Sequence, residues 1–258
     1  PKKARSTRAE IMASPRIIVA SLIVIAALAI LISLGNWQMR RLAWKEDLIA
    51  RVAERMVAAP ADLSAAASTD LARPDFLAEN EYRSVVLAGT FRPQATIRSY
   101  TALSDPNGPL QGPGYWVLTL FELGSGQSLF VNRGFIPFDL EEAVPPPPAG
   151  PFSVSGIVRA PETGNFMTPE PDMEKRIWYA RNTPEIASDL SIGSDVLPFF
   201  IDADASMTPP GGLPQAGETR TIFPNSHFQY AMTWYGLAAA LVCVFGFYMI
   251  SYRKGASP

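Results

Sequence analysis

Two long uncharged stretches lie near the ends of the chain, and the residues between them alternate between short apolar runs and polar turns. The first stretch, Ile17–Leu34, has eighteen residues, and the second, Tyr230–Ile250, has twenty-one. A helix rises about 1.5 Å per residue, so either stretch can cross the roughly 30 Å hydrocarbon core of a bilayer. The pattern predicts two transmembrane helices that flank one large extramembrane domain, which makes the lipid bilayer the first expected partner.

Basic residues before the first stretch raise the alternative of a cleavable signal peptide. The apolar core is longer than the roughly 7–15 residues of a signal peptide. No small-x-small cleavage site follows it, and a helical pattern continues instead. We therefore interpret the first stretch as an uncleaved signal anchor.

The charges beside the two stretches predict their orientation. Lysine and arginine gather in residues 1–16 and again at Arg253 and Lys254, and basic flanks favour the cytoplasmic side of a membrane. Further basic residues follow the first stretch, but long translocated segments largely escape this rule. We expect a multi-pass protein of the bacterial inner (plasma) membrane, or of the mitochondrial inner membrane. The expected parts are a cytoplasmic tail at 1–16, transmembrane helices at 17–35 and 230–250, a periplasmic β-rich domain at 36–229 (or its mitochondrial equivalent) and a cytoplasmic tail at 251–258.

The middle of the chain is predicted to consist mainly of short strands, because apolar runs there are bounded by Gly, Pro, Asn or Asp. Gly124–Gln127 between two of them has the composition of a hairpin turn. The connections are too short for repeated β–α–β units, which favours an antiparallel sheet or small barrel and makes the chain an α+β membrane protein. The expected strands are Arg83–Phe91, Thr96–Tyr100, Tyr115–Leu123, Ser128–Phe135, Phe152–Arg159, Arg176–Arg181 and Leu197–Asp202.

Helices are expected at two further places. Trp37–Met56 carries its large residues on one face of a 3.6-residue period, so it should continue the first stretch out of the membrane. Thr183–Leu190 begins with threonine followed by proline, a combination typical of a helix start. The stretch 58–72 is expected to be a loop with one turn of helix, and 207–217 is expected to be a loop.

Composition excludes most enzyme chemistry. His227 is the only histidine, so a site with several imidazoles is excluded. The roles that remain for His227 are a single axial ligand, a proton switch or an ordinary interfacial residue. The only cysteine, Cys243, lies inside the second stretch, and a net charge of −2 gives no indication of nucleic-acid binding. The sequence has no P-loop, GxGxxG, GxSxG or HExxH motif. A hydrolase that uses two carboxylates stays open, although the acidic residues are scattered and no pair is singled out.

Four motifs follow one another along the chain. They are G-x-W-Q-x-x-R-x-x-W-K-x-x-L-I at 35–49, E-Y-R-x-V at 81–85, V-N-R-G-F-I-P at 131–137 and N-x-H-x-Q-Y-x-x-T-W-Y at 225–235. In this order, within a frame of two apolar stretches, they resemble the Surf-one (surfeit-locus) family of cytochrome c oxidase assembly factors. The chain departs from the family's pattern at Leu120, where proline is usual, and at Asn182, where aspartate is expected.

The resemblance implies a non-enzymatic role: binding haem a transiently and assisting its insertion into cytochrome c oxidase subunit I, with haem a synthase as a further partner. A carrier of haem a needs apolar surface at the level of the lipid, a basic group for the propionates and one imidazole for the iron. The expected haem-binding residues are His227 as iron ligand, Tyr230, Trp234 and Trp37 beside the macrocycle, and Arg40 and Arg41 for the propionates.

Simpler interpretations exist for each of these residues. A single interfacial histidine is often only hydrogen-bonded, tryptophans anchor helices at interfaces, and arginines there meet lipid phosphate. Gly236 and Ala240, four residues apart, would let the two helices approach closely, and Asn132–Gly134 would form a tight turn. For the whole protein the alternative is an accessory or scaffold subunit that binds the oxidase without handling haem. A haem-modifying enzyme fits poorly with one histidine and two spans.

Overall fold

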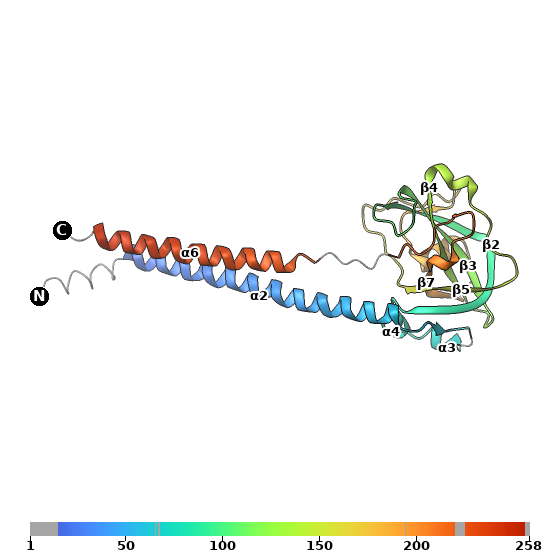
Figure 1. Cartoon of the computed structure of the whole chain (residues 1–258), viewed down its shortest axis with the longest axis horizontal. Coiled ribbons are helices and arrows are strands. Elements are labelled where there is room, and N and C mark those ends of the chain that lie inside the picture. The colour runs from blue at the N-terminus through green and yellow to red at the C-terminus, as the bar shows by residue number, and fades with distance from the viewer. Residues whose placement is uncertain (1–14, 65, 67, 194, 220–224, 256–258) are drawn as a thin grey trace, which may run out of the picture. The chain divides into compact units, whose positions relative to one another are not determined.

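The computed structural model describes residues 15–64, 66, 68–193, 195–219 and 225–255. The chain divides into two compact units, one made of Pro1–Ala50 with Ile222–Pro258 and the other of Arg51–Thr221. The first unit holds two long helices, α2 (Pro15–Val57), whose last turns belong to the second unit, and α6 (His227–Gly255). They lie side by side, and the start of α2 is at the same end as the end of α6 (Figure 1).

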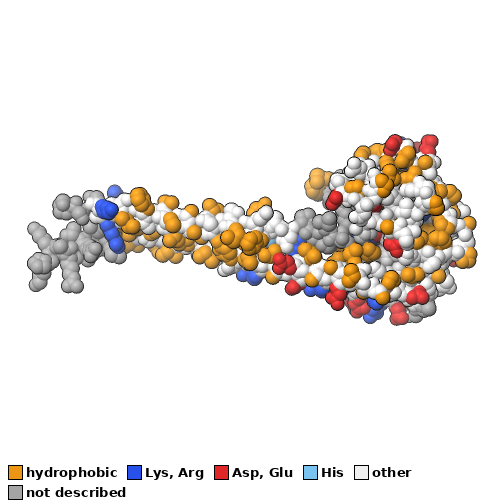
Figure 2. Space-filling view, viewed as in Figure 1, with side chains coloured by type: hydrophobic (Ala, Val, Ile, Leu, Met, Phe, Trp, Pro, Cys, Tyr) orange, Lys and Arg blue, Asp and Glu red, His pale blue; other side chains and the backbone are white. Residues whose placement is uncertain are grey.

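Both helices are long and apolar enough to cross a membrane. Figure 2 shows hydrophobic side chains along both of them, and Ile23 and Phe247 are among those that are largely exposed. Such a surface is unfavourable in water, whereas it suits hydrocarbon. The two apolar helices expected from the sequence are confirmed, and α2 continues to Val57, as the helical period of Trp37–Met56 predicts.

The two helices contact each other along one stripe, in which the less exposed positions of α2 recur every three or four residues up to Gln38. Tyr235 of α6 packs against Gly35, where a Cβ atom would lie only 2.4 Å from the tyrosine ring. The expectation that Gly236 and Ala240 allow the approach is wrong. Both are exposed, and a Cβ at Gly236 would meet open space. On α6 the buried small residues are Ala231 and Ala238, and Tyr235 packs against Gly35 of α2.

The second unit is built on a seven-stranded sheet. Its strands connect in the order β2-β3-β4-β7-β5, and β5 pairs again with β2, so these strands close into a small barrel. The short β1 and β6 add to β2. The strands are β1 (Ala61–Asp62), β2 (Ser84–Leu103), β3 (Gly112–Leu123), β4 (Ser128–Pro137), β5 (Pro151–Arg159), β6 (Ile177–Trp178) and β7 (Val196–Ala203), and the helices are α3 (Ser68–Leu71), α4 (Phe76–Asn80) and α5 (Thr183–Asp189), with 3-10 turns at Phe138–Ala143 and Ala205–Met207.

The expectation of an antiparallel sheet is wrong, because the sheet is mixed. β4 and β7 are parallel, and so are β1 and β6 to β2, whereas the other pairs are antiparallel. β4 and β7 are not consecutive in the sequence, and β5 and α5 lie between them along the chain. The shortness of connections between neighbouring strands therefore says nothing about this pair.

Most of the expected elements are confirmed. The runs Arg83–Phe91 and Thr96–Tyr100 form one strand, β2, with an irregularity in its register between Arg92 and Thr96. The turn at Gly124–Gln127 joins β3 to β4, and Gly126 has a φ of 87°. The tight turn expected at Asn132–Gly134 is wrong, since these residues lie inside β4.

The strands bury side chains on both of their faces. Alternate residues of β2, β4 and β7 belong to one apolar cluster. The intervening residues of β4 and β7, together with residues of β3, belong to a second apolar cluster, which α5 and β6 cover. The first cluster includes Leu87, Phe121, Val131, Val154 and Ile201, and the second includes Leu118, Phe130, Trp178, Ile186 and Phe200.

Candidate functional site

The only histidine lies at the first residue of α6 and is hydrogen-bonded to α2. Nδ1 of His227 is 2.7 Å from Oε1 of Gln38, a side chain that is only 8% exposed. With Oε1 of Gln38 as the acceptor, the neutral imidazole makes this contact as the tautomer that carries its proton on Nδ1 and its lone pair on Nε2. No residue in the described part of the chain forms a hydrogen bond with Nε2. The contact thus fixes the tautomer and the orientation of the imidazole.

A second polar contact joins the same two helices. The hydroxyl of Tyr235 donates to Oδ1 of Asn36 over 2.7 Å, with Gly35 beneath the tyrosine ring. Asn36 and Gln38 belong to the motif at 35–49, and His227 and Tyr235 to the motif at 225–235. The structure therefore brings together two motifs that are almost two hundred residues apart in the sequence.

The other expected haem-binding residues differ in how far they are exposed. Trp234 is partly buried, whereas Tyr230 and Trp37 are about half exposed. Arg40 and Arg41 are exposed, and the guanidinium of Arg41 lies 4.3 Å from the ring centre of Trp44 on its own helix. His227 is therefore brought to Gln38, while these aromatic and basic residues remain at the surface of the helices.

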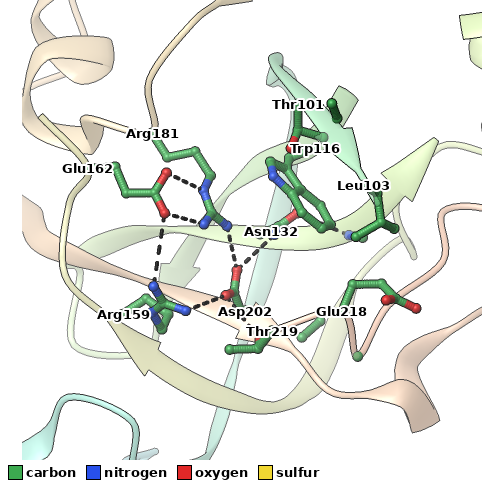
Figure 3. A pocket seen from close by; sticks show the side chains of 14 residues that line it. Thr101, Leu103, Trp116, Asn132, Arg159, Glu162, Arg181, Asp202, Glu218 and Thr219 are labelled. Atoms are coloured by element: carbon green, nitrogen blue, oxygen red, sulfur yellow. Dashed lines mark hydrogen bonds and ion pairs between the residues drawn. The ribbon is translucent and has the colours of Figure 1, made fainter. Parts of the chain in front are cut away.

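The second unit contains a polar cavity of about 240 Å³ (Figure 3). The guanidinium of Arg181 lies between two carboxylates: its Nε donates to Oε2 of Glu162 and its Nη1 donates to Oδ1 of Asp202, both over 3.0 Å. Asp202 also accepts from Nδ2 of Asn132 over 2.7 Å and lies 3.5 Å from Nη1 of Arg159. Figure 3 shows these side chains converging from different strands and loops.

The charges of this cavity are paired with one another. Burial alone would lower the pKa of Arg181, but the charge of Asp202 and the hydrogen bond that Arg181 donates to Glu162 outweigh it and hold the pKa above its ordinary value. Arg159 is likewise within 4 Å of both Asp202 and Glu162. Because the cations and carboxylates neutralise one another, we interpret this group, hereafter the charge network (Arg159, Glu162, Arg181 and Asp202), as a structural element that joins β5 and β7 to the residues before α5.

Sequence reasoning missed Gln38 and the charge network. Gln38 and Asn132 both occur in motifs that the sequence displays, so their positions were visible but their partners were not. Among the described residues, no group of three or more His, Cys, Asp and Glu side chains is arranged to hold a metal ion. An iron bound as haem needs fewer protein ligands than such a site, since the macrocycle supplies the others.

These features define a class: a protein whose two terminal apolar helices are hydrogen-bonded to each other and whose central part is a closed mixed barrel. Residues 25–239 match the model of the SURF1 family, a range that includes both the His227–Gln38 contact and the barrel. The chain belongs to the SURF1 family.

Relatives are similar over most of their length. The SURF1-like protein of Monosiga brevicollis is 33% identical over 241 residues, which cover 87% of this chain and 84% of that protein. Surfeit locus protein 1 of Rattus norvegicus is 36% identical over 221 residues, 80% of this chain and 68% of the relative. The protein of the same name from Homo sapiens is 34% identical over 221 residues, 80% of this chain and 70% of the relative.

Proposed function

We propose that this chain is a membrane-bound assembly factor of cytochrome c oxidase that binds haem a and assists its insertion into subunit I. Membership of the SURF1 family, a family of oxidase assembly factors, supports the assembly role. The observation that carries the haem-binding part is the hydrogen bond between Nδ1 of His227 and Gln38. Haem a synthase, as the source of the group, and oxidase subunit I, as its destination, are the proposed partners.

The imidazole of His227 fits a haem iron. Histidines that ligate metals usually donate their other N–H to an oxygen acceptor, which fixes the tautomer and orients the ring. Gln38 supplies this acceptor, so Nε2 can present its lone pair to the iron. Haem a would supply the redox-active iron that the oxidase needs, and this chain only binds and releases it.

The surface beside His227 suits the rest of the group. Tyr230 and Trp37 offer half-exposed aromatic rings for an apolar macrocycle. Arg40 and Arg41 are exposed guanidinium groups, which can pair with propionates. In this proposal, the haem lies at the outer surface of the helix pair and not inside a preformed pocket, which suits a carrier that must give it up.

The exposed apolar surface of α2 and α6 supports a place in the inner membrane, with the second unit in the periplasm or the corresponding mitochondrial compartment. Alkaline phosphatase, which is active only outside the cytoplasm, tests this orientation. Fusion after Gly150 should give activity and fusion after Pro258 should give none. The reverse result would overturn the orientation.

The oxidase itself provides the test of the assembly role. Oxidase purified from a strain without this chain should contain subunit I with a reduced ratio of haem a to protein. Partial activity should remain, because haem can enter without help but more slowly. Full haem occupancy together with lost or unstable subunits would overturn the haem-delivery proposal and favour a scaffold subunit.

A further inference from the structure

One buried arginine, unlike those of the charge network, has no carboxylate partner among the described residues. Arg133 of β4 is 7% exposed, as is Arg181, but its one hydrogen bond within the described chain is from Nη2 to the carbonyl oxygen of Pro145, over 3.0 Å. Burial lowers the pKa of Arg133 to about 10. No other acceptor for Arg133 lies in the part of the chain that the structure describes, and none of its nitrogen atoms is among the fully buried ones without a partner, so its remaining N–H donors reach open space.

Such an arginine is unfavourable for the fold by itself. A buried charge that lacks its counter-ion is strongly destabilising, and guanidinium groups otherwise form paired hydrogen bonds with oxyanions. Arg181 shows how this fold pairs a buried guanidinium, since Glu162 and Asp202 lie on either side of it. The contrast indicates that the counter-ion of Arg133 comes from outside the chain.

Arg133 lines a cavity of about 400 Å³ next to the proline connector, Pro145–Pro147. This volume lies within the range of small-molecule sites. The walls are largely apolar, and the rim is basic. Apolar residues of the walls include Ile97, Val117, Ile136 and Val144, and the charged residues of the lining are Arg98, Arg133, Glu141, Lys175 and Arg176.

The rim keeps an excess of positive charge after its internal pairs are counted. Arg98 forms an ion pair with Glu141 at 2.8 Å, and Lys175 lies 3.8 Å from Asp172. Arg176 donates to the carbonyl oxygen of Gln94 and, like Arg133, has no carboxylate partner in the described ranges. Two guanidinium groups thus remain for a ligand, one buried and one exposed.

We propose that this cavity binds an oxyanion, a carboxylate or a phosphate, that is attached to a small apolar body. Arg133 binds the oxyanion with its planar fork, Arg176 adds charge at the rim, and the apolar body lies against the proline connector and the aliphatic walls. The site is separate from the His227–Gln38 contact, and it does not depend on haem binding.

Calorimetric titration of the full chain in phosphatidylcholine nanodiscs tests the ligand chemistry. Hexanoate and hexyl phosphate are the probes, and hexanol, hexylamine and inorganic phosphate are the controls. We expect at least one of the two probes to bind ten-fold or more tightly than every control, and the comparison of the two probes distinguishes a carboxylate from a phosphate. If hexanol bound as tightly as the better probe, the ligand would not need an oxyanion and the proposal would be overturned. If inorganic phosphate bound as tightly as the better probe, the ligand would not need an apolar body and the proposal would be overturned as well.

Variants test the role of Arg133. Arg133→Met should weaken binding of the better probe ten-fold or more, while the melting temperature stays unchanged or rises because a buried unpaired charge is removed. Arg92→Gln, which removes an exposed arginine paired with Glu122 elsewhere on the barrel, should leave binding unchanged. Arg176→Gln should weaken binding several-fold without disturbing the core. A lower melting temperature for Arg133→Met together with unchanged binding by Arg176→Gln would show that Arg133 is structural and would overturn the proposal.

Discussion

Removal of Asp202 should destabilise the barrel strongly, because this one carboxylate joins several buried groups. It accepts hydrogen bonds from Asn132, Arg181 and Thr219 and forms an ion pair with Arg159. Asp202→Ala leaves the buried guanidinium of Arg181 with Glu162 alone, and breaking a buried ion pair costs about 3–5 kcal/mol. For a domain of this size, about 2–4 °C of melting temperature corresponds to 1 kcal/mol, so the expected decrease is roughly 6–20 °C.

The assay must report on the barrel and not on the helix pair. Hydrogen–deuterium exchange of peptides from β4 and β7, followed as the full chain in nanodiscs is heated, meets this need. The matched control is Glu79→Ala, which breaks the exposed pair between Arg73 and Glu79. An exposed pair contributes at most about 1 kcal/mol, so this control should shift the transition by no more than about 4 °C. Equal shifts for the two variants would refute the interpretation of the charge network as a structural element.

Two further predictions concern packing. Gly35→Ala places a methyl group against the ring of Tyr235. It should lengthen the distance between spin labels on the two helices, or broaden its distribution, as measured by electron–electron double resonance. Gly236→Ala, whose methyl group meets open space, should leave that distance unchanged. Phe130→Ala removes a fully buried ring and should cost about 3–5 kcal/mol in chemical denaturation of the barrel, whereas Phe166→Ala, at a side chain that is 95% exposed, should cost nothing measurable.

The sequence predicts the elements of this fold well and their pairing less well. Uncharged runs of eighteen and twenty-one residues and short runs bounded by turn residues are local patterns, so α2, α6 and most strands could be located. The parallel pair of β4 and β7 could not, because its partners are far apart in the sequence. Both strands contain three apolar residues in a row, Leu129–Val131 in β4 and Phe199–Ile201 in β7, instead of a strict alternation. That pattern is typical of strands buried on both faces, but it does not name the partner.

The candidate site shows the same limit. His227 could be singled out because it is the only histidine and begins an apolar helix. Gln38 could not be assigned as its partner, since their contact depends on how α2 and α6 pack. Asp202 and Glu162 are ordinary acidic residues in the sequence, and only the closure of the barrel places them on either side of Arg181. Arg133 lies in a visible motif, but only the fold shows that no carboxylate among the described residues pairs with it.

The visible absorption spectrum of the purified full chain with haem a tests whether His227 ligates the haem iron. Wild-type protein should show a Soret band, His227→Ala should lose or strongly shift it, and Tyr235→Phe, which removes only the neighbouring hydrogen bond to Asn36, should keep it. Gln38→Leu should retain the band but weaken haem affinity about 10–100-fold, because the imidazole loses the acceptor that orients it. A spectrum of His227→Ala that is identical to the wild type would contradict the account and leave Met39 and Met232 as the ligands to test.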